Sequence, residues 1–205
     1  ITTLNKRLKK WHNSLPILLP KDINFLTENH TRIYPNSLKI MASTHKNLSL
    51  YDPSVVPSGE NKHFGIVVSD YNSDITYSLL SACIETLQDH QVAEKDITVW
   101  HVPGAFELPL AAQKMVEDTP EINAVICIGC VITGETKHDD YINQAVAQAI
   151  MQLGMSYSLP IVFGVLTPRT YEQALARAGG EHGNKGIEAA ISALRMAELM
   201  GGNLF

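Results

Sequence analysis

The chain has 205 residues, of which 45% are hydrophobic, and a formal net charge of -5. This length suffices for one domain with a buried core, and no stretch approaches the roughly 20 consecutive apolar residues of a membrane-spanning helix. Residues 1–62 carry 9 Lys and Arg against 4 Asp and Glu, whereas residues 63–205 carry 7 against 17. Because nucleic-acid binding requires clustered Lys and Arg, the acidic larger part of the chain argues against a nucleic-acid partner.

Residues 1–47 are predicted to be a flexible N-terminal extension, and residues 48–205 the folded domain. The first segment has no sustained hydrophobic period and contains turn-forming residues such as Pro16 and Pro20. The chain begins with Ile, and Met41 opens a more ordinary segment. We therefore expect residues 1–40 to lie upstream of a true start at Met41, which N-terminal sequencing of the native protein would test.

From residue 63 onward, segments typical of strands alternate with segments typical of helices. The expected strands are residues 63–70, 96–102, 124–132 and 160–167, and the expected helices are residues 75–91, 106–118, 139–155, 171–178 and 185–199. This alternation predicts right-handed β-α-β units. The fold is then an α/β three-layer sandwich of about four parallel strands flanked by helices, with its ligand site beyond the carboxyl ends of the strands.

Polar and aromatic side chains follow every predicted strand. They lie in residues 69–72, 102–107, 133–138 and 167–170. Two aromatic rings, an amide, a carboxylate, hydroxyls and a histidine on one rim suit a flat polar heterocycle with a hydroxylated arm. The sequence contains neither GxGxxG nor GxxxxGK[ST], so a dinucleotide site and a P-loop lose their main support.

The stretch GETKHDDYI, residues 134–142, joins the third strand to a helix. Its first backbone N–H groups could hold a phosphate, and His138 could transfer protons at neutral pH. The same residues also fit a plain helix start, in which the acids satisfy the helix dipole. A phosphate site needs a cation, which Arg177 could supply, although an arginine in the last turn of a helix is by default solvated. Lys185 is expected to pair with Glu188.

The three cysteines, Cys83, Cys127 and Cys130, are odd in number and lack a disulfide framework, which indicates unpaired thiols in a reducing compartment. Cys127 and Cys130 are three residues apart in a predicted strand and so point to opposite faces. Buried thiols are therefore favoured over a redox pair or a zinc site. Met115, Met151 and Met196 lie on helical faces and are interpreted as core.

Four motifs in order, VPGAFELPLAA, GCVITGETKHDDYI, PIVFGVLT and EQALARAGGEHGNKGIEAA, resemble the 6,7-dimethyl-8-ribityllumazine synthase family. The resemblance runs from about Leu48 to the C-terminus. It implies a flavodoxin-like fold and a cytoplasmic homopentamer whose active sites are shared between neighbouring subunits. Packing of pentamers into an icosahedral shell, and riboflavin synthase as a partner, stay open.

The resemblance also implies the reaction and the residues that carry it. The family condenses 5-amino-6-ribitylaminouracil with 3,4-dihydroxy-2-butanone 4-phosphate in riboflavin biosynthesis, without a metal or an organic cofactor. The implied roles are pyrimidine stacking for Tyr71 with Asn72 beside it, ring contacts for the backbone of Cys130, Val131 and Ile132, ribityl contacts for Ala105, Phe106 and Glu107, phosphate binding for Glu135 and Thr136, proton transfer for His138, and contributions from the adjacent subunit for Phe163 and Arg177.

Two positions depart from the usual family pattern. Tyr71 stands where Phe or Trp is usual, and Glu135 places an anion in a loop that is to bind an anion. Two alternatives remain: a flavin- or lumazine-binding protein without turnover, and a purely structural shell protein. The presence of His138, Arg177 and the phosphate loop together favours the enzyme.

Overall fold

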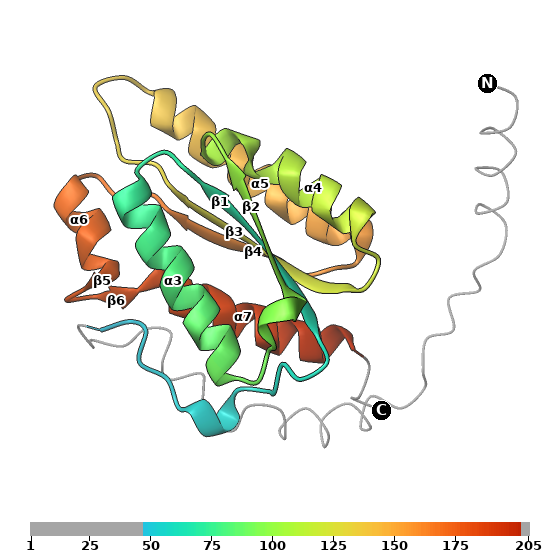
Figure 1. Ribbon diagram of the computed structural model, residues 1–205. Coiled ribbons are helices and arrows are strands. Elements are labelled where there is room, and N and C mark those ends of the chain that lie inside the picture. The colour runs from blue at the N-terminus through green and yellow to red at the C-terminus, as the bar shows by residue number, and fades with distance from the viewer. Residues whose placement is uncertain (1–46, 202–205) are drawn as a thin grey trace, which may run out of the picture. The chain divides into compact units, whose positions relative to one another are not determined.

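A computed structural model of the chain describes residues 47–201 (Figure 1). The expectations about residues 1–46, a flexible extension and a start at Met41, lie outside the described residues. The central sheet consists of parallel strands, namely β1 (His63–Ser69), β2 (Ile97–Val102), β3 (Ile122–Cys130) and β4 (Ile161–Leu166). The helices are α3 (Ser73–Asp89), α4 (Leu108–Asp118), α5 (His138–Tyr157), α6 (Tyr171–Ala176) and α7 (Lys185–Met200). None of these helices is long and apolar enough to cross a membrane.

The strands lie in the order β2-β1-β3-β4, so β2 and β4 are the two edges of the sheet. β1 pairs with β2 from Phe64 opposite Ile97 to Ser69 opposite Val102, and β3 pairs with β4 up to Cys130 opposite Leu166. Because all strands run in one direction, their carboxyl ends form a single rim. The loops that follow the strands gather at this rim, at the upper left of Figure 1.

Helices cover both faces of the sheet, which confirms the three-layer α/β sandwich (Figure 1). On one face, α3 and α7 pack over a core that includes Ile66, Leu79 and Leu194, all fully buried. On the other face, α4 and α5 pack over a second core that includes Val67 and Leu108. Burial on both faces explains why the strands are nearly continuous apolar runs rather than alternating ones.

The element bounds differ from the sequence expectation at the second helix and the third strand. Residues 105–107 form a short 3₁₀ helix, and α4 begins only at Leu108, with Pro109 in its first turn, where no N–H is needed. β3 starts and ends two residues earlier than expected. An antiparallel pair, β5 (Ala178–Gly180) with β6 (Gly183–Asn184), separates α6 from α7 and was not expected.

The interpretation of the methionines as core is right for one and wrong for two. Met115 is fully buried under α4, whereas Met151 is 64% exposed and Met196 is 40% exposed. A helical period marks an apolar face but does not say what covers it. Leu110 of α4 and Tyr141, Met151 and Met155 of α5 are exposed large apolar side chains, which together make up the exposed apolar surface of α4 and α5, and such side chains are common at interfaces.

Helices α3 and α7 approach so closely at Gly186 that no side chain fits there. A Cβ atom at this position would lie 2.0 Å from the carbonyl oxygen of Leu79. We expect Gly186→Ala to lower the free energy of unfolding by about 3 kcal/mol, because either helix must shift. Urea unfolding measures this, with Gly134→Ala as control, since a Cβ there meets nothing within 4 Å. Equal stability of both variants would contradict the close packing.

Candidate active site at the carboxyl ends of the strands

The loop after β1 presents an aromatic ring to solvent. The N–H of Asp70 donates to Val102 O at 2.8 Å, and the N–H of Tyr71 donates to Pro103 O at 3.1 Å, so this loop continues the pairing of β1 with β2. Asn72 has a left-handed backbone with φ of 57° and donates from Nδ2 to Cys130 O at 3.0 Å. The side chain of Tyr71 is left 71% exposed at the rim, where a planar ligand can stack on it.

Three side chains, Asp70, Tyr77 and His101, form a cluster beside this loop, here called the Asp70 cluster. Oδ1 of Asp70 accepts from the Tyr77 hydroxyl at 2.8 Å and from Nδ1 of His101 at 2.8 Å. The rings of Tyr77 and His101 meet edge to face, with centroids 5.6 Å apart. The hydrogen bonds from His101 and Tyr77 lower the pKa of Asp70, so it stays an ionised acceptor at neutral pH. Sequence reasoning missed the cluster.

The loop after β2 is the expected ribityl loop, residues 105–107. Ala105 is buried in the core below α4, so only its backbone can meet a ligand, whereas Phe106 is 58% exposed. Glu107 is exposed at the start of α4. A free carboxylate at this place can accept hydrogen bonds from several hydroxyls.

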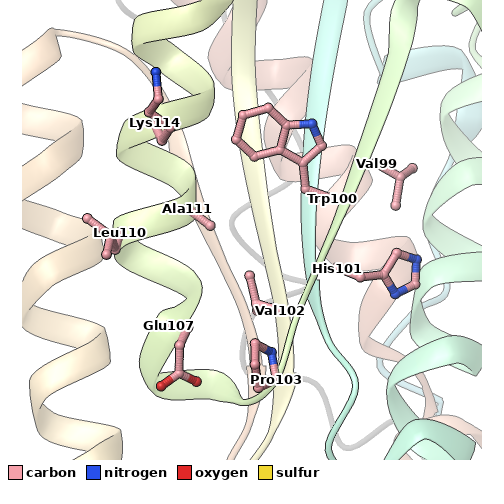
Figure 2. Close-up of a pocket in the computed structure, with 9 residues that line it drawn as sticks. All are labelled: Val99, Trp100, His101, Val102, Pro103, Glu107, Leu110, Ala111 and Lys114. Atoms are coloured by element: carbon pink, nitrogen blue, oxygen red, sulfur yellow. The ribbon is translucent and has the colours of Figure 1, made fainter.

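A shallow apolar groove of about 620 Å³ runs from this loop along the edge strand β2. Figure 2 shows Trp100 and Val102 of β2 on the side of α4, where Glu107, Leu110 and Lys114 also line the groove. Val99 and His101 point to the opposite side of the strand. The groove shares Pro103 and Glu107 with the rim, but most of it lies beside the sheet edge. It was not predicted from the sequence.

Two of the three residues at the end of β3, Cys130 and Val131, already use a backbone group in a hydrogen bond. The carbonyl of Cys130 accepts from Asn72, and the N–H of Val131 donates to Leu166 O at 2.9 Å. Within the described part of the chain, the N–H of Ile132 makes no backbone hydrogen bond. Ile132 is thus the best placed of the three to offer an N–H to a ligand ring.

The expected phosphate loop leads from β3 into α5. Glu135, Thr136 and His138 are exposed, and His138 is the first residue of α5. The hydroxyl of Thr136 accepts from the N–H of His138 at 3.4 Å. Lys137 occupies the cap position of α5 with no side-chain cap bond. Lys137 is a cation inside the loop itself, visible in the sequence but given no role in the sequence analysis.

Arg177 ends helix α6 and is already bonded within its own chain. Its guanidinium donates to His182 O at 2.6 Å and to Oε1 of Glu188 at 2.5 Å. Lys185 pairs with the other oxygen of Glu188 at 3.1 Å, as expected. The side chain of Arg177 is only 17% exposed, so the network fixes its direction.

Phe163 does not lie at the rim of its own chain. It is opposite Cys127 in the edge strand β4, three residues before that strand ends, and is half-buried. Tyr71 and the ribityl loop follow β1 and β2, on the other side of the sheet. One copy of the chain therefore does not bring Phe163 together with Tyr71.

The cysteines are free and buried. Cys127 belongs to the core under α4 and α5 and Cys130 to the core under α3 and α7, which confirms that they point to opposite faces. Within residues 47–201, no group of three or more His, Cys, Asp or Glu could hold a metal ion.

Comparisons with known proteins agree on one family. A model of the 6,7-dimethyl-8-ribityllumazine synthase family matches residues 61–201. A protein with that name from Porphyromonas gingivalis is 50% identical over 78% of the chain and 98% of its own length. Its namesakes from Flavobacterium johnsoniae and Parabacteroides distasonis are 47% and 45% identical, over 77% and 76% of the chain and 82% and 97% of their own lengths.

Burial should make the thiols unreactive in the native protein. It raises the pKa of Cys127 to about 12 and of Cys130 to about 11, and it raises the pKa of Cys83 as well. Since the thiolate is the reactive form, we expect no fast reaction with Ellman's reagent at pH 8, and reaction of all three thiols in guanidinium. A native thiol that reacts as fast as in the denatured chain would contradict this burial.

Proposed function

The chain belongs to the 6,7-dimethyl-8-ribityllumazine synthase family, and we propose that it condenses 5-amino-6-ribitylaminouracil with 3,4-dihydroxy-2-butanone 4-phosphate. The products are 6,7-dimethyl-8-ribityllumazine, phosphate and water, as a step of riboflavin biosynthesis. The observation that carries the proposal is the combination at one rim of an exposed ring, a free carboxylate and a histidine at a helix start.

The pyrimidine would bind at the loops after β1 and β3. The exposed ring of Tyr71 offers a stacking surface, which a phenol provides as well as a phenyl group does. Asn72 spans the gap to Cys130 and closes one side of the site. The N–H of Ile132 is the best candidate for a hydrogen bond to the ring.

The ribityl arm would extend along residues 105–107. The carboxylate of Glu107 accepts from its hydroxyl groups, while Phe106 and the backbone of Ala105 limit the space around the arm. The exposure of Glu107 in the single chain supports this role, because no other group occupies its oxygens in the described residues.

The phosphate would bind at the start of α5. Backbone N–H groups there point outward and attract anions, and Thr136 adds a hydroxyl. Lys137 supplies a cation from the same loop and Arg177 a second one from another subunit. Two cations offset the unfavourable charge of Glu135, which we expect to contribute its N–H while its carboxylate turns toward solvent.

His138 would move the protons of the reaction. The primary amine of the pyrimidine attacks the ketone, and the resulting carbinolamine loses water to give an imine. Enolisation expels the phosphate, and the second amine closes the ring by attacking the remaining carbonyl carbon, with loss of a second water. Each step transfers a proton, and a well-placed general acid and base commonly contributes about 10²- to 10⁴-fold. The position of His138 beside the phosphate loop suits this role.

A homo-oligomer would complete the site. Phe163 lies in the edge strand β4, whereas Tyr71 and Glu107 follow β1 and β2. Arg177 is bonded to Glu188 of its own chain, and we propose that a neighbouring copy supplies Phe163 and Arg177. The exposed apolar surface of α4 and α5 and the groove along β2 offer the contact area. We propose a pentamer and leave its packing into an icosahedral shell to measurement by electron microscopy.

We further propose that the enzyme is cytoplasmic and that riboflavin synthase uses its product. Free cysteines suit a reducing compartment.

A direct test of the function is to mix the purified full-length protein with both substrates and follow the fluorescence of the lumazine. Absence of product at saturating substrate would overturn the proposal, and a protein that binds lumazine without forming it would be the binding alternative.

Two substitutions should separate the two kinds of role. Arg177→Ala should raise the KM for the phosphate substrate at least about tenfold, because a charged hydrogen bond is lost, with a smaller effect on the pyrimidine. His138→Ala should lower kcat about 10²-fold with both KM values little changed. Steady-state kinetics with each substrate varied in turn measures both.

The matched control is Lys62→Ala, which removes another half-buried cation. Nζ of Lys62 pairs with Oε2 of Glu198 at 2.9 Å, and this pair does not lie at the rim. This variant should leave all constants unchanged. Unaltered kinetics of Arg177→Ala would refute the phosphate role of Arg177.

A further inference from the structure

The exposed ring of Tyr71 has no anchor of its own. Its side chain makes no hydrogen bond and no ring contact with any residue that the structure describes, and 71% of it is exposed. A ring that turns freely loses conformational entropy when a ligand stacks on it. Before binding, the backbone on either side sets the direction of the Cα–Cβ bond of Tyr71 and thereby the region that the ring can occupy.

Both neighbours of Tyr71 are held in place. Asn72 is fixed by its bond to Cys130 and by its left-handed backbone. Asp70 is fixed by the two hydrogen bonds of the Asp70 cluster, one from β2 and one from α3. A single carboxylate oxygen thus joins three elements immediately before the stacking ring.

We propose that Asp70, held by His101 and Tyr77, is a positioning residue that sets the direction of the Tyr71 ring and thereby the affinity for the pyrimidine substrate. The inference rests on the proposed function, in which Tyr71 stacks on that substrate. It assigns a role to three residues that have no part in the chemistry described above, namely Asp70 in the loop after β1, His101 of β2 and Tyr77 of α3.

His101 acts through Asp70 and not on the substrate. In Figure 2 its ring points to the side of β2 opposite Trp100 and Val102. Because a carboxylate only accepts, the proton of His101 lies on Nδ1 and is committed to Asp70. Tyr77 packs its ring edge against His101, so the donor pair is itself ordered.

The test compares the kinetics of Asp70→Ala with those of Asp70→Asn in the full-length oligomer. Asp70→Ala should raise the KM for the pyrimidine substrate about five- to tenfold, because two hydrogen bonds to a charged acceptor are lost. The KM for the phosphate substrate and kcat should stay within about twofold. Asp70→Asn keeps an accepting oxygen and should restore the KM to within about twofold of wild type. Tyr77→Phe, which removes one donor and keeps the ring, should give an intermediate KM.

A matched control separates positioning from general loss of a carboxylate. Asp52 is also exposed and also accepts two hydrogen bonds, from the N–H of Ser54 at 2.9 Å and from its hydroxyl at 2.7 Å. Asp52→Ala should leave all constants unchanged. Equilibrium dialysis of 6,7-dimethyl-8-ribityllumazine gives the same ranking of variants from binding alone, independent of turnover.

Three results would overturn the inference while the proposed function stands. In each, wild type forms lumazine. In the first, Asp70→Ala keeps the wild-type KM for the pyrimidine. In the second, all constants worsen together and Asp70→Asn fails to rescue them. In the third, Asp52→Ala has the same effect. Absence of lumazine formation by wild type would instead refute the proposed function itself.

Discussion

The strand order β2-β1-β3-β4 is the constraint on which the site depends. Parallel strands need helical crossovers, and burial of both sheet faces by α3, α7, α4 and α5 leaves only the carboxyl rim for ligands. The same order puts the stacking ring and the ribityl loop beside one edge strand and Phe163 on the other. The two edges of this open sheet lie apart, so under the proposed function the chain alone would hold an incomplete site. The exposed apolar side chains of Leu110, Tyr141, Met151 and Met155 are consistent with a site shared between copies, because a second copy could cover them.

The charged residues expected to bind the phosphate also fall into two groups, one around Arg177 and one at the start of α5. Arg177 forms an ion pair within its own chain with Glu188, which Lys185 also contacts. This network holds the guanidinium in one direction. The start of α5 carries Lys137 and outward N–H groups but also Glu135 and two aspartates. Under the proposed function, neither group of residues alone would bind an anion strongly, whereas the two together would. The proposed shared site would explain both the acid Glu135 in the phosphate loop and the ordered side chain of Arg177.

The sequence predicted the layers, the four strands and the opposite directions of Cys127 and Cys130, because apolar runs bounded by turn residues carry that information locally. It did not predict the Asp70 cluster, since Asp70 and His101 meet only through the register of β1 with β2. The interpretation of Met151 as a core residue is wrong, because a helical period shows which face of a helix is apolar but not whether another element covers that face. Lys137 is visible in the sequence as a cation of the loop before α5, whereas the bonding of Arg177 to Glu188 depends on the hairpin between α6 and α7. The roles of the site residues stay predictions.

The most direct test of the shared site is activity of mixed oligomers. Tyr71→Asp and Arg177→Ala proteins, each nearly inactive alone at low substrate, are denatured together in equal amounts and refolded. If Tyr71 and Arg177 of one site come from different subunits, random mixing yields intact sites at about one quarter of the interfaces, and about one quarter of wild-type activity returns. If both residues served the site of their own chain, every site would keep one lesion and the mixture would stay as inactive as its components, which would contradict the account.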